Sequence, residues 1–177
     1  MTERASDGES QLQSFETFKT DVLRFLFNEI SPIQDLTGNR SQIRFSDPRL
    51  GEPRRNEEEC LGIEATYAAP LSVNVGYQVV ETGEVREQEI FIGDFPLMTP
   101  RGTFIVNGSE RSPVADVNEV LENQLRRGLK SMAQTTRNRM AKTDPEIATP
   151  SSLISSRPFI GAIKRSLQHI TATSPQG

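Results

Sequence analysis

The spacing of hydrophobic residues changes several times along the chain. Near the start, apolar side chains recur every three or four positions, which predicts an amphipathic helix over residues 15–28 that ends before Pro32. Its apolar stripe consists of Phe15, Phe18, Val22 and Leu26. Residues 1–13 lack this period and are polar, so we expect them to form a disordered tail.

The middle of the chain alternates between apolar and polar residues, as half-buried strands do. One alternating run extends from Leu71 to Val79 and a second from Val85 to Ile92. Gly83 lies between them and accommodates the positive φ of a tight turn, so the two runs predict an antiparallel hairpin. Shorter strands are expected at 43–45 and 102–108.

The C-terminal part returns to a helical period. Asp116 is a candidate N-cap with Glu119 three residues later, and an apolar stripe follows, which predicts a helix over 116–141. That stripe contains Val117, Leu121, Leu125, Leu129 and Met132. Shorter helices are expected at 149–153 and 157–167, and 169–177 reads as a second tail.

These elements predict an α+β fold, a twisted and mainly antiparallel sheet with helices packed against it. Neither the β-rich half (14–111) nor the helical half (112–168) has enough apolar residues for its own core. We therefore expect a single domain over 14–168.

Composition restricts the setting of the protein. No apolar run is long enough to cross a membrane, and the first residues do not have the pattern of a secretory signal. The single cysteine, Cys60, excludes an internal disulfide and fits a reducing compartment. We expect a cytoplasmic protein without a membrane partner.

Charge is distributed unevenly along the chain. Residues 111–177 carry ten Lys or Arg against five Asp or Glu, although the whole chain has a net charge of −4. A basic surface suits contact with nucleic acid, because bound cations displace the counterions of phosphate. A solvated helix face explains the same charges equally well.

No constellation of catalytic residues is evident. His169 is the only histidine, and Cys60 follows three glutamates, an acidic setting that disfavours the thiolate. The run 57–59 consists of glutamates, which bind hard metals, but consecutive glutamates are more often a solvated surface turn. We expect no metal, no cofactor and no active site in this chain alone.

Several blocks of sequence resemble one family, the β subunit of bacterial RNA polymerase. They are Ile30-Ser31-Pro32-Ile33-Gln34-Asp35, Arg49-Leu50-Gly51-Glu52-Pro53, Ala65-Thr66-Tyr67-Ala68-Ala69-Pro70-Leu71, the run from Thr82 to Thr99, and Gly102 to Arg111. The helical part adds Asn123-Gln124-Leu125-Arg126, Asp144-Pro145-Glu146 and Ala162-Ile163-Lys164. The order of the blocks is that of the family's protrusion domain.

The chain departs from the family at two places. After Arg111 it turns directly into Ser112-Pro113 and the long helix, where the family has a connecting segment and the lobe domain. After Lys164 the family's entry into the inhibitor-pocket region is replaced by Arg165-Ser166-Leu167. Catalytic residues therefore cannot be carried over, and an engineered fragment, a designed sequence and a divergent relative all remain open.

The resemblance implies a role in transcription without catalysis. The protrusion forms the upstream wall of the DNA cleft, contacts other polymerase subunits, and offers a hairpin strand to the transcription-repair coupling factor and CarD-type regulators. The matching partner-binding residues are Val85, Arg86 and Glu87, and an exposed strand suits such docking because a partner sheet can extend it. We expect a charge swap at Arg86 and Glu87 to abolish docking without unfolding the domain.

Basic residues of the long helix are candidates for weak contact with upstream DNA, since phosphate contacts need only positive charge within reach. They are Arg126, Arg127, Lys130, Arg137, Arg139 and Lys142. Two other hypotheses stay open: a free-standing regulator that binds DNA or mimics the polymerase, and an unrecognised enzyme.

Overall fold

The computed structural model of the chain describes residues 2–171. Its helices are α1 (Thr2–Thr17), α2 (Leu23–Glu29), α3 (Glu57–Gly62), α4 (Val117–Lys142), α5 (Pro150–Leu153) and α6 (Arg157–Ile170), with a π-helical turn at Phe18–Val22. The strands are β1 (Ile33–Gln34), β2 (Ser41–Leu50), β3 (Ala68–Val79), β4 (Val85–Pro96), β5 (Phe104–Val106) and β6 (Ser109–Arg111).

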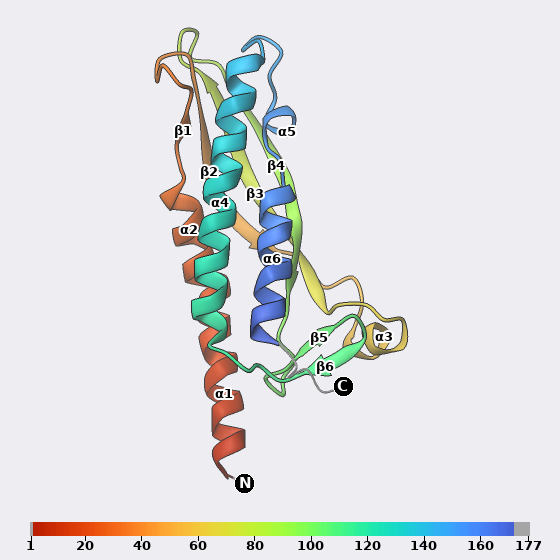
Figure 1. Cartoon of the computed structure of the whole chain (residues 1–177). Helices are drawn as coiled ribbons and strands as arrows, with labels where there is room; N and C mark the ends of the chain where they lie inside the picture. Colours follow the sequence, from red (N-terminus) through yellow and green to blue (C-terminus); the bar gives the residue numbers. More distant parts are fainter. Residues whose placement is uncertain (1, 172–177) are drawn as a thin grey trace.

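One antiparallel sheet forms the centre of the molecule. Its strand order is β1-β2-β3-β4, and β5 and β6 pair in a separate ribbon near α3. Helices α2, α4 and α6 lie on one face of the sheet, and α1 continues beyond it (Figure 1). The predicted α+β fold with an antiparallel sheet is confirmed.

The core lies between the helices and the inner face of the sheet. Alternate residues of β3, from Ala69 to Val79, are buried, as the period-2 pattern predicts. The Phe27 ring of α2 lies 5.8 Å from that of Phe45 on β2 and 6.3 Å from that of Phe159 on α6. Both halves of the chain thus contribute to one continuous hydrophobic cluster.

The long helix closely follows its prediction. It begins after Asp116, whose side chain accepts a hydrogen bond from the backbone N–H of Glu119. All five residues of the expected stripe are buried. The two shorter helices are also present, and Thr149 and Ser152 form a reciprocal capping box at the start of α5.

The N-terminal helical segment differs from the prediction in two respects, the residue at which it begins and the residues that it buries. The backbone is helical from Thr2, so the expected tail over 1–13 is wrong for residues 2–13. The π-helical turn adds a residue per turn and moves the stripe, so that Leu23 is buried where Val22 was expected. Local spacing alone gave no sign of this shift.

Other boundaries also differ. The run 57–59 forms the first turn of α3, capped by Asn56, instead of a surface turn. His169 lies in the last turn of α6, so the helix passes the expected start of the second tail, and 172–177 lie outside the described residues. Across the part of the chain that the structure describes, no helix combines the length and apolar character of a membrane span.

Candidate functional site

The docking residues suggested by the resemblance lie on β4, one of the two edge strands of the sheet. Strand β4 pairs with β3 alone, so half of its backbone N–H and C=O groups point away from the sheet. Val85, at its start, is 51% exposed, and Glu87 is also exposed. The start of β4 therefore presents a free edge together with the exposed side chains of Val85 and Glu87.

Val85 and Glu87 lie on the outer face of the sheet, since Glu87 pairs with Gly76, which alternates with the buried residues of β3. Within the described residues, α2, α4 and α6 lie on the other face (Figure 1). Glu87 pairs with Gly76 on β3, and Gly76 pairs with Arg44 on β2, so the three positions form one row. Because Gly76 has no side chain, a hollow of about 470 Å³ lies over it, with Arg44 and Glu87 on its two sides. The outer face is thus polar and concave beside the docking strand.

Arg86 points to the opposite face and is already bound. Its guanidinium donates hydrogen bonds to the backbone carbonyl of Pro145, at 2.9 Å, and to that of Ala148. It also pairs with the carboxylate of Glu84, at 3.1 Å, and lies 6.0 Å above the buried ring of Tyr77. The Arg86 side chain is only 22% exposed, so it is less accessible to a partner than Val85 and Glu87, with which the resemblance groups it.

The arginine changes the acidity of its neighbour. Its hydrogen bond to the Glu84 carboxylate lowers the pKa of Glu84, and the same bond raises the pKa of Arg86. Arg86 is therefore charged at every pH at which the protein is folded. Its charge holds the loop between α4 and α5 against the sheet.

The basic residues of α4 fall into three groups. Arg126 is already paired, because its guanidinium contacts the carboxylate of Glu29, at 2.9 Å, and that of Glu122, at 3.0 Å. These bonds lower the pKa of Glu29 and raise that of Arg126, and they join α4 to α2. Arg126 is thus a structural residue in the described chain.

Three other cations share the solvent side of α4. Arg127 and Lys130 are exposed and Arg137 is half-buried, and the three occupy one stripe about 15 Å long at the helical rise of about 1.5 Å per residue. Neither 123–142 nor the whole of α6 contains an Asp or Glu. The C-terminal part of α4 and the whole of α6 therefore present positive charge without carboxylates of their own.

Arg139 and Lys142 form the third group, in the last turn of α4. Both are exposed. Cations in this position stabilise a helix by offsetting the negative end of its dipole, whether or not a ligand is present. Their position alone does not identify them as DNA contacts.

The weak candidates for catalysis do not converge. Cys60 is buried in α3, and burial raises the pKa of its thiol, which leaves less of the reactive thiolate. His169 lies exposed at the end of α6. Glu57 contacts the guanidinium of Arg101 at 3.2 Å. Glu57 and Cys60 thus lie on α3, whereas His169 lies on α6.

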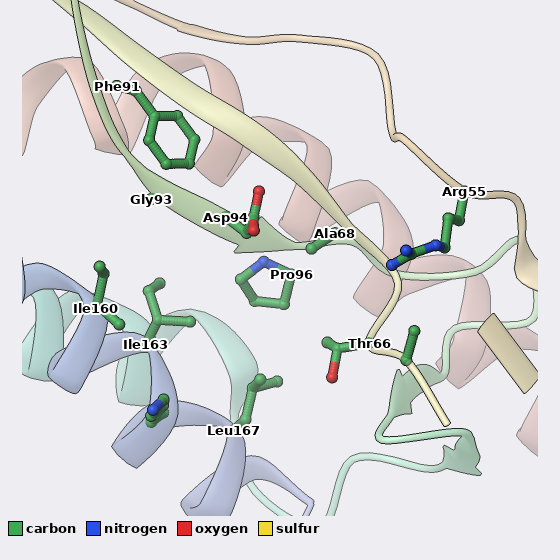
Figure 2. Close-up of a pocket in the computed structure, with 12 residues that line it drawn as sticks. Arg55, Thr66, Ala68, Phe91, Gly93, Asp94, Pro96, Ile160, Ile163 and Leu167 are labelled. Carbon is green, nitrogen blue, oxygen red and sulfur yellow. The ribbon is translucent and has the colours of Figure 1, made fainter. Parts of the chain in front are cut away.

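A second cavity was not predicted from the sequence. It measures about 390 Å³ and lies between α6, β4 and the loop before α3, a surface we call the α6–β4 groove. Figure 2 shows Ile160, Ile163 and Leu167 of α6 facing Phe91, Asp94 and Pro96 of β4. Nothing in the local sequence pairs residues 91–96 with residues 160–167, so only the folded chain reveals this groove.

Comparison with known proteins agrees with this geometry. The RNA polymerase beta subunit family matches residues 8–160, across both the sheet and the helical layer. The DNA-directed RNA polymerase subunit beta of Chloroflexus aggregans is 52% identical over 109 residues, which cover 62% of this chain and 9% of the relative. The DNA-directed RNA polymerase subunit beta of Staphylococcus aureus strain JH9 is 53% identical over 109 residues, which again cover 62% of this chain and 9% of the relative.

The relatives are much longer proteins, and the match spans about 9% of their length. The order of the sequence blocks, the antiparallel sheet with its helical layer and the match over 8–160 all agree. The chain belongs to the RNA polymerase β subunit family, in its protrusion-like part.

Proposed function

We propose that the chain acts in transcription as the protrusion of a bacterial RNA polymerase β subunit. In this role it forms the upstream wall of the DNA cleft, contacts other polymerase subunits, and serves as a docking platform for regulators. The observation that carries the platform role is the free edge of β4 at Val85 and Glu87.

The partner in this proposal is the Tudor-like module of a coupling-factor or CarD-type regulator. A strand of the module extends the sheet by pairing with the outer edge of β4, which supplies affinity through backbone hydrogen bonds. Val85 offers an apolar contact, and Glu87 selects a partner with a basic side chain. Arg86 contributes indirectly, by holding the start of β4 against the helical layer.

A double variant, Val85→Asp with Glu87→Lys, tests the platform. It should weaken docking of the module by at least about tenfold, because it removes the apolar contact and reverses the selecting charge. Both side chains are exposed, so the melting temperature should stay within a few degrees. Isothermal titration with an isolated regulator module measures the affinity.

The control is Glu58→Lys, which repeats the Glu-to-Lys substitution of position 87 on the exposed side of α3. It should leave the affinity unchanged. If the double variant binds the module as tightly as the parent chain does, docking does not use this stretch of β4 and the platform assignment is wrong.

Contact with upstream DNA is the second part of the proposal, and the lack of Asp and Glu in 123–142 and in α6 favours it. Three surface cations cannot hold DNA tightly, since each phosphate contact contributes only modestly at physiological salt. The isolated chain should therefore bind DNA weakly. A free-standing DNA-binding regulator, the alternative function, would bind tightly and lose affinity steeply with salt.

Fluorescence anisotropy with a labelled duplex separates the two functions. In the triple variant Arg127→Glu, Lys130→Glu, Arg137→Glu, the slope of log K against log salt should flatten by about 0.9 for each lost phosphate contact. The variant Arg126→Gln should not mimic it, because Arg126 is held by Glu29 and Glu122. An unchanged slope in the triple variant would remove α4 from the DNA contact.

A further inference from the structure

We infer that the α6–β4 groove is a second docking site, which binds an extended, acidic peptide segment of a partner protein. It is separate from 85–87 and lies at the other end of β4. The proposal does not depend on the platform role, because a different surface carries it.

The first argument is the shape and lining of the groove. Its volume, about 390 Å³, falls in the range of about 300–1,000 Å³ that is typical of ligand pockets. Two of its apolar side chains, Phe91 and Ile160, are 47% and 37% exposed. Gly93 lies between them, and a side chain there would meet Cγ1 of Ile160 at 3.1 Å, so the glycine allows α6 to approach β4.

The second argument is the strand at the bottom of the groove. Four of the lining residues belong to β4: Phe91, Gly93, Asp94 and Pro96. Because β4 is the last strand of its sheet, the backbone groups on its outer edge have no strand partner. A chain in extended conformation can pair with such an edge while its alternate side chains enter the groove.

The third argument is charge. Arg55 and Lys164 are exposed lining residues on opposite walls, and Arg54 lies next to them with its guanidinium 5.7 Å above the Phe91 ring. None of the three cations makes an ion pair with any residue that the structure describes. Asp94 is the only acidic side chain in the lining, so the groove is complementary to an acidic partner.

These features favour a peptide over single-stranded nucleic acid. Nucleic-acid sites of that kind stack bases on aromatic rings, whereas most of the apolar lining here is aliphatic. Phe91 is the one aromatic side chain in the lining, and Arg54 already lies over its ring. A strand edge likewise has backbone donors and acceptors suited to another strand.

The test uses the whole chain and a fluorescein-labelled peptide of sequence Glu-Val-Glu-Leu-Glu-Val, with a Lys-Val-Lys-Leu-Lys-Val peptide for comparison. The acidic peptide should bind saturably and the basic one should not. In the double variant Arg55→Glu, Lys164→Glu, affinity should fall on the order of tenfold or more, because two attractive charges become repulsive. Asp94→Lys should act in the opposite direction and tighten binding several-fold.

Arg139→Glu is the matched control, since it reverses one exposed cation at the far end of α4. It should leave the affinity of the acidic peptide unchanged, and so should the Val85→Asp, Glu87→Lys variant. The last result separates this site from the regulator platform. Amide chemical-shift changes in 91–96 and in α6 should locate the peptide.

Three outcomes would overturn the inference. The first is that the acidic peptide does not bind at concentrations up to about 1 mM, a range that includes weak interactions. The second is that both peptides bind equally and the charge variants do not change the affinity of either. The third is that a labelled oligothymidylate binds more tightly than the peptide and loses affinity in the Arg55→Glu, Lys164→Glu variant. That result would make the groove a nucleic-acid site. If the double variant is unfolded, the Asp94→Lys variant still tests the inference. Tighter binding of the acidic peptide supports it, and unchanged binding contradicts it.

Discussion

Arg86→Ala should clearly lower the free energy of unfolding, by several times the change at an ordinary exposed position. The guanidinium is the hydrogen-bond donor to the carbonyls of Pro145 and Ala148, and its loss leaves both without this partner. The contact with the Tyr77 ring is lost as well, and the exposed pair with Glu84 contributes little. Chemical denaturation followed by circular dichroism measures the change.

Arg86→Lys should recover only part of the stability, because a lysine keeps the charge but not the planar fork that reaches two carbonyls. Arg44→Ala, an exposed position on the outer face of the same sheet, should change stability by less than about 0.5 kcal/mol. A loss as small as this at Arg86 would mean that water satisfies the two carbonyls instead. The charge swap at Arg86 and Glu87 that the sequence suggested would thus disturb the fold, and it is unsuitable as a test of docking.

The second large effect is expected at Gly128, where α4 crosses α6. A side chain at this position would place its Cβ 2.8 Å from that of Ala162 and 2.9 Å from the backbone oxygen of Pro158. The oxygen belongs to the first turn of α6 and cannot move without displacing the helix. Gly128→Val should therefore cost about 3 kcal/mol, at the upper end of what overpacking does.

Thermal unfolding should show this as a fall in melting temperature of roughly 10 °C for a domain of this size. Gly62→Ala is the control, because the Cβ it would add at the end of α3 meets no atom within 4 Å outside the adjacent residues and the backbone of its own helix. It should be neutral or slightly stabilising. If Gly128→Val melts at the parent temperature, the two helices do not pack as closely as described.

The contrast between Arg86 and Val85 explains why sequence reasoning reached only part of the candidate site. Alternation placed the two residues on opposite faces of β4, but it did not say which face the helices cover. The partners of Arg86 are carbonyls near residues 145–148, about 60 positions away. Arg126 illustrates the same limit, since Glu29 on another helix removes it from the basic surface.

The elements themselves could be predicted where a strong local pattern existed. The β3–β4 hairpin and the long helix with its Asp116 cap depend on alternation, turn chemistry and capping, all of which act within a few residues. Helix α3 and the ribbon strand β6 were missed because they are short and carry no repeated pattern. The helical backbone of 2–13 was missed because its sequence is polar.

By itself, the sequence determined the β3–β4 hairpin, the long helix α4 with its buried stripe, and the family to which the chain belongs. Those properties follow from local periodicity and from the order of the sequence blocks that resemble the family. Only the tertiary structure decided the order of the strands, which cations are free, and the existence of the α6–β4 groove. The physical reason is that these depend on contacts between residues far apart in the chain, which hydrophobic burial creates and local pattern does not encode.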